Sequence, residues 1–361
     1  MPLLAHNLSN MLGQPSTALP HSNSPFVSAY NRKTNVLSSA TWIKTPDLTP
    51  LPTTAGNYAT GCDFDPHGTV LAVSLTVSPY IRFYNRVGDS FNTGTTTISQ
   101  LPSAASVRGI AWHPNGQFIA VPQETTPYIN IYLRNGNTYT RLADSVFGGS
   151  LPTGAVRGAA WNPAGNVLAL GLNASPWVYF YKFNVQTATF TKISNPATLP
   201  TGGADNVDWH PSGNIVTVAH SNSPYMTNYW WDGTTFTKLA NPSALPSGTQ
   251  ASTPAWSFNG SYLAISGGSS PYVYIYTVSI NGTSSTLTQL PTASTLSPAA
   301  AASQGYGLRW LNDGGFMFGP YLTPFFAWYT PSGTNTWALT PQPVPLPAGN
   351  INGALAVYPR R

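Results

Sequence analysis

The stretch VRGIAWHPNGQFIAVPQETTPYINIYLRNGNTYTRL, residues 107–142, contains one complete structural unit of this chain. An apolar run ends at Trp112, and the turn residues Pro114-Asn115-Gly116 follow it. Three more β-rich runs follow, over 117–122, 127–133 and 138–142, and Asn135-Gly136-Asn137 between the last two is typical of a hairpin turn. The pattern predicts a sheet of four antiparallel strands.

Three markers repeat this unit along the chain. The first is a Ser/Thr-Pro-aromatic corner, whose prolines are spaced 54, 48, 49, 48, 47 and 53 residues apart. The second is a Leu-Pro pair, present seven times between Leu51-Pro52 and Leu346-Pro347. The third is a large aromatic at the end of the first run, found at Phe64, Trp112, Trp161, Trp209, Trp256, Trp310 and Tyr358. A period near 50 with four strands per unit predicts an all-β fold, a seven-bladed β-propeller.

The chain ends predict how the ring closes. Residues 351–359 read as a first strand without its followers, whereas the first proline corner lacks a first strand before it. We therefore expect one domain over 1–361, with an N-terminal arm at 1–15 and a closing blade shared by 16–45 and 346–361. An insertion at 292–304 interrupts the period and contains a possible helical turn.

The aromatic-x-Pro-x-Gly turn after the first strand, as in Trp161-Asn162-Pro163-Ala164-Gly165, resembles the WD-repeat type of propeller. The run from Ser78 to Tyr84 resembles that family's third strand. The Gly-His dipeptide is missing, and Trp-Asp occurs once, at Trp231-Asp232. The resemblance implies a rigid platform that binds other macromolecules.

Composition excludes several classes. Charged residues make up 7% of the chain, and its net charge of +5 comes from cations that are mostly scattered singly, which argues against a nucleic-acid partner. No apolar run is long enough for membrane insertion, and Met1–Asn10 lacks the features of a signal peptide. The single cysteine, Cys62, lies in an apolar strand and is expected to be a buried, inert thiol.

The proline corners suggest a binding surface. In a four-stranded meander these corners and the Leu-Pro links lie on one rim, where proline stiffens the backbone. The expected rim residues are the seven corner aromatics: Phe26, Tyr80, Tyr128, Trp177, Tyr225, Tyr272 and Phe325. The alternative is that these rings pack between neighbouring blades.

The titratable groups offer little chemistry. Asp63 and Asp65 flank Phe64, and Asp205 and Asp208 precede Trp209, so either pair of carboxylates could serve acid-base work or a cation. Arg108 and Arg157 match Asp205 in the first-strand register within two blades of it, which leaves an inter-blade ion pair equally open. His67, His113 and His210 fall in or beside the post-aromatic turn and lack metal-ligand spacing. The sequence predicts no catalytic residue, no metal and no cofactor.

These observations predict a non-enzymatic interaction scaffold. The low charge, the abundance of small polar residues and the absence of a disulfide suggest a virion component, a phage tail, fibre or capsid-attached protein made in the host cytoplasm. Its partners would be other proteins of the assembly or host-surface glycans. Two alternatives remain: a multivalent carbohydrate-binding lectin and a propeller enzyme of lactonase type.

Overall fold

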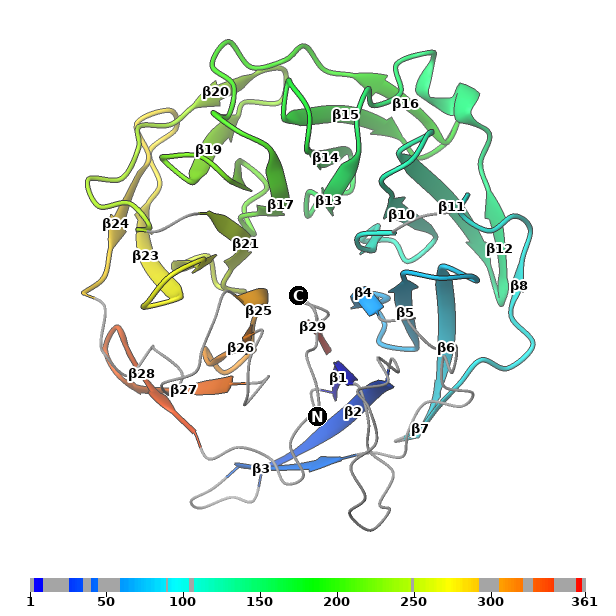
Figure 1. The fold of residues 1–361 in the computed structure, drawn as a ribbon, viewed down its shortest axis with the longest axis horizontal. Coiled ribbons are helices and arrows are strands. Elements are labelled where there is room, and N and C mark those ends of the chain that lie inside the picture. The colour runs from blue at the N-terminus through cyan, green and yellow to red at the C-terminus, as the bar shows by residue number, and fades with distance from the viewer. Residues whose placement is uncertain are drawn as a thin grey trace, which may run out of the picture.

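In the computed structural model the chain is an all-β propeller of four-stranded antiparallel blades (Figure 1). The structure describes residues 3–8, 26–34, 40–44, 59–88, 90–103, 107–247, 250–291, 305–320, 327–340 and 355–358. The side chains of 3–8, 26–34, 40–44, 305–306, 320 and 356–358 are outside this description. The insertion predicted at 292–304 lies outside the described residues.

Six sheets each take their main strands from one continuous stretch of chain. The first two contain β4 (Ala59–Phe64), β5 (Val70–Leu75), β6 (Ile81–Val87) and β7 (Ser90–Asn92), then β9 (Ala111–Trp112), β10 (Phe118–Pro122), β11 (Ile129–Asn135) and β12 (Thr138–Arg141). The next two contain β13 (Val156–Trp161), β14 (Val167–Leu172), β15 (Val178–Asn184) and β16 (Thr189–Lys192), then β17 (Ala204–Trp209), β18 (Ile215–His220), β19 (Met226–Trp231) and β20 (Phe236–Lys238). The last two contain β21 (Ala251–Trp256), β22 (Tyr262–Gly267), β23 (Val273–Ser279) and β24 (Thr286–Gln289), then β25 (Gly305–Trp310), β26 (Phe316–Pro320), β27 (Ala327–Gly333) and β28 (Thr336–Leu339).

Two shorter elements lie between blades. Strand β8 (Thr97–Ile98) pairs in parallel with β12 and adds a fifth strand to the outer edge of the second sheet. The short 3-10 helix η1 (Asp144–Phe147) follows β12, and its Phe147 is buried. The link after a blade therefore contributes to the packing of its neighbours.

A further four-stranded sheet joins the two ends of the chain, in the order β29 (Leu355–Tyr358), β1 (Leu3–Leu8), β2 (Phe26–Thr34) and β3 (Ala40–Lys44). All its pairings are antiparallel, with Leu3 opposite Tyr358 and Leu8 opposite Phe26. Strand β29 is the innermost of the four and contacts both β4 and β25. Strand β1 falls inside residues 1–15, the segment that the sequence assigned to an arm.

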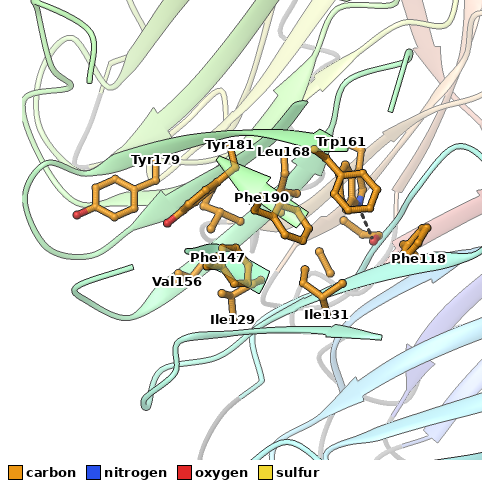
Figure 2. Close-up of a cluster of buried hydrophobic side chains, with 14 of the residues drawn as sticks. Phe118, Ile129, Ile131, Phe147, Val156, Trp161, Leu168, Tyr179, Tyr181 and Phe190 are labelled. Atoms are coloured by element: carbon orange, nitrogen blue, oxygen red, sulfur yellow. Dashed lines mark hydrogen bonds between the residues drawn. The ribbon is translucent and has the colours of Figure 1, made fainter. Parts of the chain in front are cut away.

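The core consists of apolar layers between adjacent blades. In one of them Phe147, Tyr181 and Phe190 pack together beside Trp161 (Figure 2). The indole N–H of Trp161 donates to the carbonyl oxygen of Ala111 in the preceding blade at 3.2 Å. Trp112, Trp209 and Trp310 make the same bond to Asp63, Ala160 and Ala255. The recurring tryptophan therefore links each of these first strands by a hydrogen bond to the first strand of the preceding blade.

Candidate active site in the central channel

An irregularity in the inner strands directs side chains into the channel. In β4, β13, β17, β21 and β25 the pairing with the second strand skips at the same place, near the start of the strand. The skipped residues include Thr60, Arg157, Asp205 and Ser252, all of which line the channel cavity. A bulge of this kind turns a side chain away from the strand's normal alternation. Strict alternation therefore does not predict what faces the channel.

Glycines next to the bulges let neighbouring inner strands come close. A Cβ atom at Gly158 would lie 2.6 Å from the Cα of Asn206, and one at Gly61 would lie 2.8 Å from the Cα of Gly109. Real Cβ atoms do not approach other atoms so closely, so a larger residue would push the blades apart. Tight packing of the inner strands holds the bulged side chains in fixed positions around the channel.

The cavity at the centre of these strands has a volume of about 480 Å³. Its lining includes five charged side chains from four blades, Arg108, Arg157, Asp205, Asp208 and Arg309. The size fits a small polar ligand. In a chain with 7% charged residues, this gathering of charge is the feature that singles out the channel.

Two side chains from neighbouring blades hold Asp205 at the cavity. Its Oδ1 accepts a hydrogen bond from Nη1 of Arg157 at 2.7 Å, and its Oδ2 accepts one from Nε2 of Gln250 at 3.0 Å. The side chain of Asp205 is 18% exposed. Burial raises the pKa of Asp205, and the two arginines, Arg157 and Arg108, oppose this rise. The predicted inter-blade ion pair between Arg157 and Asp205 is confirmed.

Arg108 lines the same cavity. Its Nε and Nη2 atoms lie 2.7 and 2.5 Å from Oε1 of Glu124, and both side chains remain partly exposed. Arg108 also interacts electrostatically with Asp205. Arg108 therefore interacts with two carboxylates, Glu124 outside the cavity lining and Asp205 within it.

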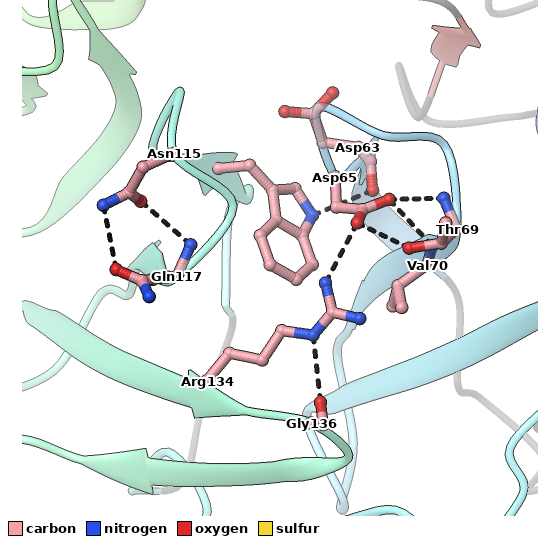
Figure 3. A network of polar contacts seen from close by, with 9 residues as sticks. Asp63, Asp65, Thr69, Val70, Asn115, Gln117, Arg134 and Gly136 are labelled. Carbon is pink, nitrogen blue, oxygen red and sulfur yellow. Dashed lines mark hydrogen bonds and ion pairs between the residues drawn. The ribbon is translucent and has the colours of Figure 1, made fainter.

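The other acidic residues separate into different environments. Asp208 lines the cavity and a smaller adjoining pocket, which also contains Asp63 and Arg309, and its Oδ2 accepts the backbone N–H of Trp256 at 2.8 Å. Asp65 belongs to neither lining and is fully buried, where it binds Arg134 (Figure 3). Asp63 and Asp65 therefore do not form one carboxylate site.

Two of the three turn histidines connect blades. The Nε2 atoms of His113 and His210 lie 2.8 and 2.9 Å from the carbonyl oxygens of Gly165 and Gly260 in the next blade. Their Nδ1 atoms accept backbone N–H groups, so Nε2 carries the proton and donates it. Burial lowers the pKa of both histidines. His67 is exposed.

The predicted rim aromatics lie at the corners between second and third strands. Tyr80, Tyr128, Trp177, Tyr225 and Tyr272 each follow a cis proline and have a positive φ of 62–71°. All five are half-buried, and every one except Trp177 packs against a core cluster between blades. The side chains of Phe26 and Phe325 lie outside the described residues. Binding at this rim stays a prediction.

The described residues contain neither a metal-binding cluster of side chains nor a membrane-spanning helix. No three His, Cys, Asp or Glu side chains of the described part of the chain gather where they could hold a metal ion. Over the same residues, no helix combines the length and the apolar character needed to cross a membrane. Cys62 lines the cavity but is buried, and burial raises the pKa of its thiol to about 12.

Two residues of this site, Gln250 and Glu124, were not predicted from the sequence to belong to it. Gln250 immediately precedes β21 and reaches Asp205 from the next blade. Glu124 is the single glutamate of the chain, and it follows β10. The rarity of charge was the available signal, because it made Arg108, Arg157 and Asp205 conspicuous at one register.

Solved structures resemble this one in fold. A candidate 6-phosphogluconolactonase from Bacteroides uniformis has a TM-score of 0.71 at 12% sequence identity, covering 99% of this chain and 98% of that one. A periplasmic gluconolactonase from Pseudomonas aeruginosa has a TM-score of 0.67 at 11% identity with the same coverage. The β-propeller domain of Cps50 (Swd1) from Myceliophteria thermophila has a TM-score of 0.58 at 10% identity, covering 85% of this chain and 94% of that one. No protein-family model and no curated protein matches the chain in sequence.

These similarities correct the sequence interpretation. The assignment to the WD-repeat type is wrong, because solved structures that match over the whole chain are lactonase propellers. The turn pattern misled because Trp161 ends an inner strand and Gly165 supplies the positive φ of the tight turn after it, and these local constraints do not identify the type of propeller. The predictions of a virion scaffold and of a non-enzyme are likewise wrong, since the same comparisons support the lactonase alternative.

Proposed function

We propose that this chain is a hydrolase of lactonase type, which opens the ring of a small polar cyclic ester in the channel cavity. The observation that carries the proposal is Asp205, a carboxylate fixed by Arg157 and Gln250 on the wall of a polar cavity of about 480 Å³. The lactonase names of two similar structures support the same reaction class. Their identities of 11–12% bear on the fold alone, so the proposal depends on the site.

Asp205 has the properties of a general base. Each of its oxygens accepts one of the two hydrogen bonds, and since a carboxylate oxygen offers two lone pairs, acceptor capacity remains for a water molecule. Burial raises its pKa, which makes the carboxylate a better proton acceptor near neutral pH. Gln250 and Arg157 come from blades on either side, so the carboxylate is held from two directions.

The arginines supply positive charge where negative charge would develop. Arg157 and Arg108 both line the cavity and both act electrostatically on Asp205. Fixed donors of this kind stabilise the oxyanion of a tetrahedral intermediate. Arg157 is positioned for this role because its bond to Asp205 uses only Nη1 among its donor atoms.

The reaction needs no group beyond these residues and water. Asp205 takes a proton from water as the water oxygen bonds to the ester carbonyl carbon, and the carbonyl oxygen becomes an oxyanion beside the arginines. The bond from that carbon to the ring oxygen then breaks, and the ring oxygen takes the proton from Asp205 as it leaves. The product is an open-chain hydroxy acid, and the carboxylate is regenerated.

The test is hydrolysis of glucono-δ-lactone by the purified chain and by D205N, with acid release followed above the spontaneous rate. We expect D205N to lower kcat/KM by roughly 10²–10⁴-fold, the usual contribution of a positioned base. D144N is the matched control, because it removes an aspartate that pairs with Arg141 away from the cavity. Equal activity of D205N and the parent chain would contradict the proposal.

We also infer that the sheet β29-β1-β2-β3 is the closing blade of a seven-membered ring. Contacts of β29 with β4 on one side and β25 on the other support this placement. Leu355 lines the channel cavity, as residues of the other inner strands do. Deleting residues 354–361 is expected to lower the unfolding temperature, and a synthetic peptide of that segment is expected to raise it again. A deletion variant as stable as the full chain would contradict this closure.

A further inference from the structure

Arg108 occupies an intermediate position at the cavity. It is paired with Glu124, outside the cavity lining, yet it lines the cavity and acts on Asp205 within it. The side chains of Arg108 and Glu124 are 42% and 28% exposed. Solvent screens an ion pair this exposed, so the pair is weak and a ligand can readily replace it.

Arg157, which also lines the cavity, has one buried donor atom without a hydrogen-bond partner among the described residues. Its Nε is buried and makes no hydrogen bond to any residue that the structure describes, while its Nη1 is bound to Asp205. Buried donors without a partner are rare in folded proteins, and each calls for an explanation. This atom is buried, so a ligand oxygen would reach it only after the Arg157 side chain shifts.

We propose that Arg108 selects ligands that carry an acidic group. Glu124 remains paired with Arg108 until such a group replaces the glutamate carboxylate. This inference concerns ligand binding at Arg108, and it rests on the proposed hydrolase function only for the identity of the ligand. An acidic group brings a negative charge that competes with Glu124 for Arg108, whereas a neutral ligand of equal size brings none. Glu124 is therefore a specificity-determining residue that never touches the reacting ester.

Removing the competitor should strengthen the binding of acidic ligands. In E124Q the side chain keeps its size but loses its charge, so Arg108 is available without displacement. We expect sodium gluconate to bind E124Q about two- to fivefold more tightly than the parent chain, the fold-change equivalent of an exposed ion pair. The affinity for neutral methyl glucoside should stay the same. R108Q should weaken gluconate binding and make it insensitive to the E124Q change.

The measurement is titration calorimetry with gluconate, inorganic phosphate and methyl glucoside on the parent chain, E124Q, R108Q and the double variant. D144N is the control, because it breaks a different arginine–carboxylate pair, between Arg141 and Asp144, away from the cavity. Tighter binding of phosphate alone would support the proposal and identify the acidic group as a phosphate, and tighter binding of gluconate would identify it as a carboxylate. E124Q affinities for both anions equal to the parent's, or lower, would overturn it. Loss of turnover in D205N does not depend on this outcome, so the two proposals can fail separately.

Discussion

Two of the Asp–Arg pairs that join neighbouring blades in the described part of the chain differ in what surrounds them. Asp65 and Arg134 meet at 2.9 Å, and Asp65 also accepts bonds from the N–H of Thr69, the hydroxyl of Thr69 and the N–H of Val70 (Figure 3). Asp205 and Arg157 meet at 2.7 Å beside an open cavity, and Asp205 accepts one further bond, from Gln250. The carboxylate of the first pair is fully buried and accepts four hydrogen bonds, whereas the carboxylate of the second accepts two and lines the cavity.

The difference shows how one ion pair can hold a fold and another can prepare a site. The guanidinium of Arg134 also lies over the Trp112 ring, 5.5 Å from its centre, so Asp65 and Arg134 are enclosed by packing. At Arg157 the buried Nε has no partner among the described residues, and Asp205 keeps acceptor capacity. Removing the first pair should therefore affect stability, and removing the second should affect ligand chemistry.

The largest expected effect is the loss of stability in D65A. The change leaves Arg134 without its carboxylate and two backbone N–H groups without their acceptor, and breaking a buried pair in this way costs about 3–5 kcal/mol. Denaturant unfolding measures it. D232A is the control, because Asp232 also accepts four bonds from its own turn but is fully exposed. A loss no greater in D65A than in D232A would mean that burial does not distinguish these carboxylates.

A second prediction concerns His220, which is buried like Asp65 but lacks full pairing. Its Nε2 lies 3.0 Å from the hydroxyl of Thr227, its Nδ1 has no partner among the described residues, and burial lowers its pKa to about 4. The unfolded chain, with an ordinary pKa of 6.5, takes up the proton first. Stability is therefore complete above pH 6.5 and decreases by about 3 kcal/mol as the pH falls towards 4.

Unfolding free energies of the parent chain and H220Q, measured between pH 4 and 8, test this prediction. H220Q should lose part of the acid sensitivity, whereas H67Q, at an exposed histidine, should keep all of it. Identical pH dependence in H220Q and the parent chain would show that His220 is not the group responsible.

A smaller effect is expected at Thr217, where a hydroxyl joins two blades without any charge. Its Oγ1 accepts the indole N–H of Trp256 at 3.1 Å and donates to Oδ1 of Asn228 at 2.7 Å. T217V keeps the shape but leaves both partners unpaired in the core, which should cost about 1–3 kcal/mol of unfolding free energy. T189V, at an exposed strand position, should cost less, and equal losses in the two variants would argue against the bridging role.

The smallest effect on stability is expected at the cavity. D205N keeps the shape of the side chain and an acceptor for Arg157, and water in the cavity can hydrate groups that lose a partner. We expect the free energy of unfolding to change by less than about 1 kcal/mol. A loss as large as that of D65A would place Asp205 among the structural pairs and remove the contrast.

Much of the fold could be predicted from the sequence, because its signals are periodic and local. The Trp-x-Pro-x-Gly turns and the β-rich runs such as 117–122, 127–133 and 138–142 predicted four-stranded antiparallel blades, since each unit repeats the same short-range constraints. The pairing of Arg157 with Asp205 could also be predicted, because equivalent positions of adjacent blades face each other. The sequence did not reveal strand β1, which lies in a segment without the markers.

The site was harder to predict because it depends on small departures from regularity. A bulge at Asp205 turns its side chain into the channel, and no pattern of residue types predicts a skipped pairing. Gln250 reaches Asp205 across a blade boundary, which requires the closeness of inner strands set by residues such as Gly158. The corner aromatics were conspicuous in sequence, yet Tyr80, Tyr128, Tyr225 and Tyr272 are half-buried against the core.

The most direct test of the hydrolytic site is the pH dependence of kcat/KM for glucono-δ-lactone in the parent chain and in D205N. The general base works as a carboxylate, so the parent's kcat/KM should fall as the pH drops through the raised pKa of Asp205. D205N should be slower by roughly 10²–10⁴-fold, and this ionisation should be missing from its profile. A D205N profile that matches the parent's in height and shape would contradict the assignment of Asp205 as the base.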